Sequence, residues 1–235
     1  MSVEEQPREG VVDRCAKAYE GGAGNRGMSG RLNGLWIPDR RFRVISFDTV
    51  KRGFDFSLAL LLLLVLFPFL LIIALIIKAS SKGPVLHWSE RVGKENRIFR
   101  MPKFRSMRID TPQLPTHLLL NPTSYLSPVG SFLRRTSLDE VPQLLSILAG
   151  KMSFVGPRPA LFNQDDLVAL RTERGVHKLL PGLTGLAQVN GRDELPIPIK
   201  VEFDYEYLRR RSFWLDLQII AATVSKALRG EGVKH

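Results

Sequence analysis

Two neighbouring carboxylates, Asp139 and Glu140, lie in a stretch of the sequence that also carries several basic residues. Arg134 precedes them, and Arg158 follows between two prolines, which fix the backbone on both sides of its charge. Adjacent carboxylates among guanidinium groups suit a site for Mg²⁺ and phosphate, in which one acid holds the metal and the arginines bind phosphate oxygens. Acids in a first helical turn are also routine in structural helices, so this pattern alone leaves the chemistry open.

The same stretch predicts the element that positions the two acids. Ser137 can cap a helix that begins near Leu138, so that both acids fall in the first turn, where the helix dipole favours negative charge. Gly150 is a natural end for this helix. Further on, the glycines of 181–192 allow either a close approach of backbone to a ligand or a set of tight turns, and the sequence does not distinguish the two.

An apolar run, Leu58–Ile77, contains twenty residues with no charge and one proline, Pro68. A straight helix of this length covers roughly 30 Å, the thickness of the hydrocarbon core of a bilayer. Pro68 removes a backbone hydrogen bond in its middle, and both flanks are basic, although basic residues normally concentrate on one side of a membrane. The run is therefore either a kinked spanning helix or a re-entrant hairpin broken at Pro68.

The charge of the whole chain points to an anionic partner. Its 235 residues carry a net charge of +11 and a pI near 10.1. Phospholipid, nucleic acid and phosphorylated substrates are all anionic partners that such a positive charge would attract. Nucleic acid is the weakest of the three, because no nucleic-acid-binding pattern is present and basic residues border the apolar run. The single Cys15 excludes an intramolecular disulfide, and the polar start of the sequence predicts no cleavable signal peptide.

The segments around the apolar run differ in composition. Residues 1–35 are rich in Gly, Arg and Glu and predict a disordered tail, and 36–57 predict an interfacial lead-in that ends in the basic and aromatic sequence KRGFDF. Residues 85–108 predict two short strands around a GKEN turn. Their basic residues are typical of a patch that binds lipid headgroups, with Lys103 as the exception assigned to the site.

The C-terminal third predicts helices. Residues 161–177 indicate a polar helix, whose charges, including Arg171, are interpreted as a solvated face. An arginine cluster, Arg209–Arg211, precedes an amphipathic helix. The apolar stripe of that helix suits either a packed core or a position in the plane of the headgroups. Its members are Phe213, Leu217, Ile220, Val224 and Leu228.

Five motifs in order resemble a known family. They are KRGFDF with the proline-containing run and SKGP, then KFRSM, FLRRTSLDEVPQL, KMSFVGPRP and PGLTGLAQVNGR. Together they cover roughly residues 50–235 and are similar to the bacterial sugar transferases called monotopic phosphoglycosyl transferases, in particular the small members without extra membrane helices. The resemblance implies an α+β, mostly helical fold. It would comprise a re-entrant membrane hairpin at 58–77 and a cytoplasmic catalytic domain at 78–235, with amphipathic interfacial helices and a small β element.

The resemblance also implies a reaction at the cytoplasmic face of the bacterial inner membrane. A sugar 1-phosphate would pass from a UDP-sugar to undecaprenyl phosphate with release of UMP, by a ping-pong mechanism that begins an exopolysaccharide, O-antigen or glycoprotein glycan. Asp139 would be the nucleophile, Glu140 would help to hold Mg²⁺, and Lys103, Arg134 and Arg158 would surround the phosphates. Anionic lipid and downstream glycosyltransferases would be further partners, and nucleic acid would not.

Some residues depart from the family pattern. Phe67 replaces a serine common before the hairpin proline, Leu186 replaces a common tryptophan, and 193–196 read DELP after the Gly-Arg pair, where asparagine is usual. The sugar therefore stays open, with an N-acetylated 6-deoxy hexosamine expected ahead of galactose or glucose. A catalytically silent membrane scaffold and a nucleic-acid-binding protein are the alternatives. The intact acids and basic residues of the motifs argue against the scaffold.

Overall fold

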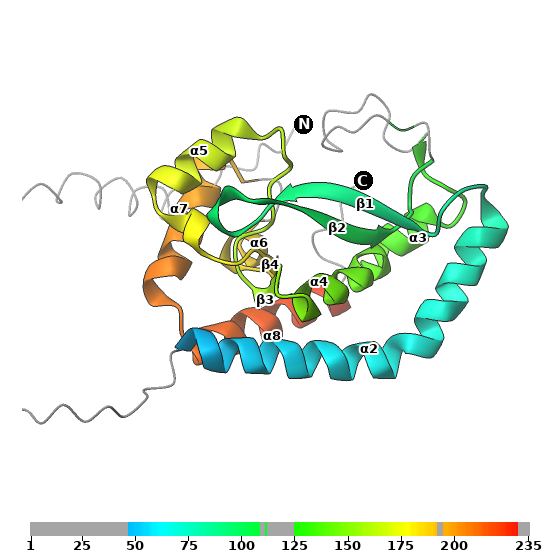
Figure 1. Cartoon of the computed structure of the whole chain (residues 1–235), viewed down its shortest axis with the longest axis horizontal. Coiled ribbons are helices and arrows are strands. Elements are labelled where there is room, and N and C mark those ends of the chain that lie inside the picture. The colour runs from blue at the N-terminus through cyan, green and yellow to red at the C-terminus, as the bar shows by residue number, and fades with distance from the viewer. Residues whose placement is uncertain (1–46, 109–110, 112–124, 192–194, 230–235) are drawn as a thin grey trace, which may run out of the picture. The chain divides into compact units, whose positions relative to one another are not determined.

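The structure, a computed structural model, describes residues 47–108, 111, 125–191 and 195–229 (Figure 1). The tail at 1–35, the first half of the lead-in (36–46) and the first two residues of the DELP departure at 193–196 lie outside these residues. The described part is mostly helical, as the resemblance implies, and has two small sheets where one small β element was expected. Its elements are α2 Phe47–Ser80, β1 Leu86–Val92, η1 Lys94–Asn96, β2 Ile98–Phe104, α3 Gly130–Arg135, η4 Leu138–Gln143, α4 Leu144–Leu148, β3 Ser153–Val155, α5 Asp165–Glu173, η5 Val176–Lys178, β4 Gly182–Thr184, α6 Leu186–Val189, α7 Ile197–Arg210 and α8 Phe213–Arg229.

Helix α2 contains the whole apolar run and is long and apolar enough to cross a membrane. It is helical from Phe47 to Ser80 with Pro68 inside it, and the ribbon changes direction partway along its length (Figure 1). Many of its large apolar side chains are exposed: Leu61 57%, Leu64 67%, Phe67 64%, Phe69 62% and Leu75 62%. An apolar surface of this extent requires an apolar environment, which supports membrane association.

The polar first part of α2 is tied to the domain that follows. Asp55, 1% exposed, accepts a hydrogen bond from the backbone N–H of Phe154 in β3 at 3.2 Å. Arg52 donates to the carbonyls of Ile147 and Leu148 at the C-terminal end of α4, the latter at 2.8 Å. These carbonyls are among the last in the helix, which have no partner within it. Through Arg52 and Asp55, the KRGFDF sequence thus attaches α2 to both α4 and β3. This attachment is additional to any role at the lipid boundary.

Strands β1 and β2 form an antiparallel hairpin, and the prediction of two strands around the GKEN turn is confirmed. The residues of β2 alternate, so that Phe99, Met101 and Lys103 share one face. Phe99 and Met101 are buried in the main core with Ile147, and β2 packs against η4. This packing places Lys103 opposite the start of η4.

Strands β3 and β4 pair in parallel, and glycine makes their close approach possible. A Cβ atom on Gly182 would lie 2.2 Å from the backbone nitrogen of Gly156. A Cβ atom on Gly185 would lie 2.1 Å from the carbonyl oxygen of the same Gly156. Any side chain at these two positions would collide with backbone. The glycines after Pro181 therefore let two segments of the chain pack directly, a use that differs from both alternatives left open for 181–192, an approach of backbone to a ligand and a set of tight turns.

Helix α8 buries part of its apolar surface in the core and exposes the rest. Ile219 is buried in the core with Tyr207 of α7, and Ile220 packs against the same cluster. Val224, by contrast, is 53% exposed and Trp214 69%. The buried face is centred on Asp216 and Ile219, so the apolar stripe read from the sequence lies partly outside it.

The bond between Arg52 and α4 gives a first prediction. Arg52→Ala removes the donors to the carbonyls of Ile147 and Leu148, of which the Ile147 carbonyl keeps the N–H of Gly150, so the free energy of unfolding should fall by about 1–3 kcal/mol. The measurement is thermal unfolding in detergent. Lys78→Ala is the matched control, since Lys78, at the other flank of α2, contacts only the exposed Gly83 carbonyl at 3.3 Å among the bonds described. An equal loss in both variants would contradict the proposed tie.

Candidate active site

The two acids lie in η4, a short 3₁₀ helix rather than an α-helix. Ser137 precedes it with φ 56°, in the left-handed region, and its side chain makes no capping hydrogen bond. The backbone N–H of Glu140 instead bonds to the Ser137 carbonyl at 3.2 Å. The helix start at Leu138 is confirmed, whereas the prediction of a side-chain cap is wrong, because Ser137 has left-handed backbone angles in place of the extended ones typical of an N-cap residue.

Glu140 receives two cations from different parts of the chain. Lys103 of β2 approaches Glu140 Oε1 with its Nζ at 2.9 Å. Arg158, in the Pro-Arg-Pro segment after β3, places its Nη2 3.4 Å from the same oxygen. Both are part-buried, so solvent screens these contacts less than it would at an open surface. The basic residue assigned to the site in β2 and the proline-braced arginine therefore meet at one carboxylate.

Arg134 approaches the acids from α3. Its Nε donates to Ser106 Oγ at 3.1 Å, and its Nη2 lies 3.1 Å from Met107 Sδ. Burial lowers the pKa of Arg134, and the negative charges of Asp139 and Glu140 oppose that change. The fold thus brings all five residues predicted for the site together: two acids from η4 and one cation each from β2, α3 and the loop after β3.

Asp139 is buried, with 8% of its surface exposed. Loss of solvent raises its pKa from 3.8 to about 6, and the charge of Glu140 adds to this rise, while Lys103 and Arg134 oppose it. At neutral pH the carboxylate is still mostly ionised. It is a poorly solvated anion beside cations, which is a reactive state for a nucleophile.

A depression beside Glu140 is lined by residues of several elements. Among them, Arg91, Gln143 and Gly182 were not predicted from the sequence. Across the hairpin from Lys103, burial and the charges of Lys103 and Arg91 lower the pKa of His87, so its imidazole is neutral at pH 7. The strand register could have indicated His87, because it pairs directly with Lys103. The full lining is Arg91, Met101, Lys103, Glu140, Gln143, Arg158, Pro159 and Gly182.

The donor set suits magnesium. Among the described residues no group of three or more His, Cys, Asp and Glu side chains is placed to hold a metal by itself. Mg²⁺ is commonly held by one or two carboxylates, with water and substrate phosphate oxygens completing its shell. Asp139 and Glu140 carry oxygen ligands of this kind, and Glu140 lines the depression together with Lys103 and Arg158.

Comparison with known proteins finds one family. The family described as bacterial sugar transferase matches residues 46–230. The chain is 42% identical over 185 residues to the UDP-glucose:undecaprenyl-phosphate glucose-1-phosphate transferase of Escherichia coli K12, which covers 75% of this chain and 40% of that protein. It is 40% identical over 197 residues to the exopolysaccharide production protein PSS of Rhizobium leguminosarum bv. phaseoli, which covers 78% of this chain and 98% of that protein.

A third relative, the UDP-N-acetylgalactosamine-undecaprenyl-phosphate N-acetylgalactosaminephosphotransferase of Aeromonas hydrophila, is 35% identical over 192 residues, 79% of this chain and 45% of that protein. The chain therefore spans about two fifths of the length of the E. coli relative and almost all of the Rhizobium one.

The buried Asp139 gives a prediction for stability. Because its pKa is higher in the folded protein than the usual 3.8, folding is favoured when the group is protonated and loses that advantage as pH rises to about 6. At pH 7.5 and without Mg²⁺, the wild type carries the full cost of the buried charge. Asp139→Asn should then raise the free energy of unfolding by about 1–3 kcal/mol, a gain that vanishes near pH 4.

The measurement is thermal unfolding with EDTA at the two pH values. Asp165→Asn, an exposed acid in the first turn of α5, is the control and should change stability by less than about 0.5 kcal/mol. If Asp139→Asn instead lowers the free energy of unfolding at pH 7.5, the prediction is wrong. The attraction between the Asp139 carboxylate and the neighbouring cations would then outweigh the cost of burying its charge.

Proposed function

The chain belongs to the bacterial sugar transferase family, and we propose that it transfers a sugar 1-phosphate from a UDP-sugar to undecaprenyl phosphate and releases UMP. The E. coli and Aeromonas relatives carry this class of reaction in their names. The observation that carries the proposal is the meeting of a buried, ionised Asp139 with Glu140, to which Lys103 and Arg158 are bound.

In the proposed first step Asp139 is the nucleophile. A carboxylate oxygen of Asp139 forms a bond to the β-phosphorus of the UDP-sugar, and the bond from that phosphorus to the bridging oxygen breaks, so UMP leaves with the electron pair. In the second step an oxygen of undecaprenyl phosphate attacks the same phosphorus and returns the carboxylate of Asp139. Splitting one displacement into two is the general gain of nucleophilic catalysis.

The surrounding cations support the transfer by their positions. Phosphoryl transfer depends mainly on positioning and on stabilising charge at the equatorial and leaving oxygens. In the proposal, three basic residues bind phosphate oxygens. Support comes from Lys103 and Arg158, which both contact Glu140, and from Arg134, which donates to Ser106. Mg²⁺ held by Glu140 would neutralise charge on the diphosphate. A binding-only scaffold would not need a buried carboxylate among these groups.

The donor sugar is proposed from the relatives. The E. coli protein is named for glucose 1-phosphate and the Aeromonas protein for N-acetylgalactosamine phosphate. We take UDP-glucose as the first candidate, ahead of the N-acetylated 6-deoxy hexosamine that the motifs alone suggest. The Rhizobium relative, of nearly the same length as the matched region, is named for exopolysaccharide production, which is the pathway class we propose here.

The membrane arrangement is a proposal of the same kind. The lipid acceptor requires the site to lie close to a bilayer, and α2 provides the apolar surface for it. We place the protein at the cytoplasmic face of the inner membrane, with α2 entering and leaving one leaflet at the bend that Pro68 allows. The tie between Arg52 and α4 would keep the catalytic domain at that surface.

The reaction is tested by UMP release. Detergent-solubilised protein with undecaprenyl phosphate and Mg²⁺ should release UMP from one member of a UDP-sugar panel that includes glucose, galactose, N-acetylgalactosamine and an N-acetylated 6-deoxy hexosamine. Asp139→Asn should lower the rate at least about 1,000-fold, because the nucleophile is lost, while Asp165→Asn keeps the wild-type rate. Release of UDP instead of UMP would reject the proposed reaction.

The hairpin is tested by cysteine accessibility. After Cys15→Ser, single cysteines at Val50 and Lys82 should both react with a membrane-impermeant reagent from the cytoplasmic side. Pro68→Ala restores a backbone donor and removes the clash in the helix, so it should straighten α2 and move the second cysteine to the other side. Two cysteines that stay on one side in the Pro68→Ala protein would show that Pro68 does not set the topology.

A further inference from the structure

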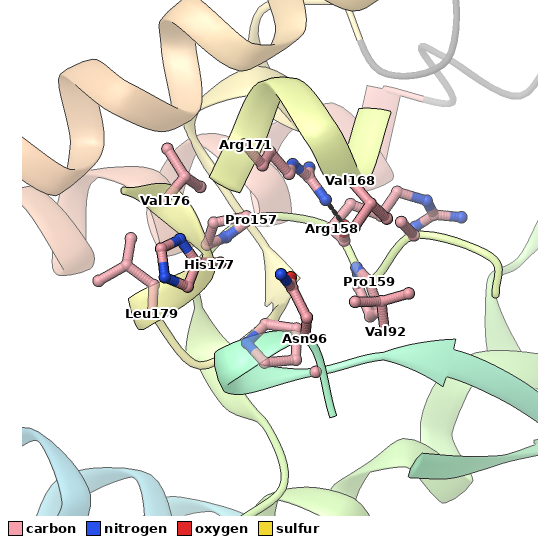
Figure 2. Close-up of a pocket in the computed structure, with 13 residues that line it drawn as sticks. Val92, Asn96, Pro157, Arg158, Pro159, Val168, Arg171, Val176, His177 and Leu179 are labelled. Atoms are coloured by element: carbon pink, nitrogen blue, oxygen red, sulfur yellow. Dashed lines mark hydrogen bonds between the residues drawn. The ribbon is translucent and has the colours of Figure 1, made fainter. Parts of the chain in front are cut away.

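Arg158 reaches the site from a loop whose backbone is held by three other segments. Its neighbours Pro157 and Pro159 accept hydrogen bonds at their carbonyls, from Gly182 N–H at 2.9 Å and from Arg91 Nη1 at 3.3 Å. The carbonyl of Arg158 itself accepts from Nη1 of Arg171 at 2.8 Å, the bond drawn as a dashed line in Figure 2. Each carbonyl of the Pro-Arg-Pro segment therefore has a donor from elsewhere in the fold.

Arg171 is itself fixed by a buried acid. Its Nε and Nη2 donate to Oδ2 of Asp204 in α7, at 3.0 and 2.6 Å. Arg171 is 8% exposed and Asp204 2%. The planar guanidinium thus donates from one edge to the carboxylate of Asp204 and from its remaining nitrogen to the carbonyl of Arg158. The single ammonium group of a lysine cannot reproduce this combination of hydrogen bonds.

The loop has room to move if this tie is lost. Arg158, Pro159 and Arg171 line an open hollow on the side of the loop that faces α5 and η5 (Figure 2). Its other walls include the apolar side chains of Val168 and Val176 and the polar side chains of Asn96 and His177. A loop released from Arg171 could shift toward this hollow and carry the Arg158 side chain away from Glu140.

We propose that Arg171 and Asp204 are positioning residues for the transfer reaction: Asp204 orients Arg171, and Arg171 holds the Arg158 carbonyl so that the Arg158 guanidinium meets Glu140 and the substrate phosphates. The inference rests on the proposed function. It assigns to α5 and α7 a part in catalysis without contact with the reacting atoms.

The kinetic test compares two pairs that join the same helices. Arg171→Lys and Asp204→Asn should each lower kcat for UMP release about 10- to 100-fold, the size of effect expected when a reacting group is misplaced by about 1 Å. The control is Glu202→Gln, which breaks the exposed pair of Arg174 with Glu202, 3.6 Å apart, and should leave kcat within about twofold of the wild type. Wild-type kcat in Arg171→Lys and Asp204→Asn would overturn the proposal.

A double-mutant cycle separates positioning from general stability. If Asp204 acts through Arg158, Asp204→Asn should cost less than about threefold in an Arg158→Ala background, where the positioned group is already gone. A merely structural role predicts the same loss in both backgrounds, and that result would overturn the proposal.

A double variant without either charge serves as the control for folding. Arg171→Met with Asp204→Leu fills the buried space with apolar groups and leaves no unpaired charge, so its melting temperature should stay near that of the wild type. Its kcat should nevertheless remain at least about tenfold low, because nothing holds the Arg158 carbonyl. A stable double variant with wild-type kcat would overturn the proposal.

Hydrogen exchange tests the tie without any activity. Peptides covering residues 154–162 should exchange faster in Asp204→Asn than in the wild type and should be unchanged in Glu202→Gln. If the wild type released no UMP from any donor, the proposed function would fail, while this measurement would still decide whether Asp204 holds the loop. Unchanged exchange in Asp204→Asn would overturn the inference.

Discussion

The buried carboxylate of Asp55 accepts the N–H of Phe154, and through this bond the apolar helix α2 is joined to the strand that leads into the Pro-Arg-Pro loop. A buried acid is costly unless its oxygens have partners, so the pairing fixes the register between helix and strand. Arg52 adds a second attachment at the end of α4, the helix that follows Asp139 and Glu140. The lipid-facing part of the chain and the part with the acids therefore form one packed unit.

The electrostatics of the site follow from this packing. Two adjacent carboxylates repel each other, and burial of Asp139 adds to the cost of ionising both. Lys103, Arg158 and Arg134 offset that cost, each from a different element. In the proposed reaction, a substrate that brings phosphate and a divalent cation would find charges of both signs already in position, so little reorganisation would be needed on binding. The same arrangement keeps Asp139 ionised at neutral pH although solvent is largely excluded.

Close backbone packing supports the arginine loop. Gly156 and Gly182 bring β3 and β4 into direct contact, and the N–H of Gly182 then reaches the Pro157 carbonyl. On the other side Arg171 reaches the Arg158 carbonyl. Prolines restrict the loop from within and hydrogen bonds restrict it from outside, so the position of one charged side chain depends on β4, α5 and α7.

The sequence by itself determined the features that arise from local patterns. The apolar run, the two strands around GKEN and the helix start at Leu138 follow from composition and spacing over a few residues, and adjacency in the chain alone made Asp139 and Glu140 a pair. The motifs also singled out Lys103, Arg134 and Arg158, and the fold brings these three residues to the pair of acids.

Only the tertiary structure decided the contacts between distant residues. Arg171 belongs to a helix that reads as a solvated face, yet it is buried because Asp204, thirty-three positions later, neutralises it. An arginine four residues after the buried Leu167, on the same side of α5, was the available signal. Ser137 lacks its expected cap because its backbone is left-handed, and KRGFDF acts as a tie because Phe154 and α4 are packed beside it. In each case the deciding partner lies elsewhere in the fold, and spacing along the chain cannot reveal it.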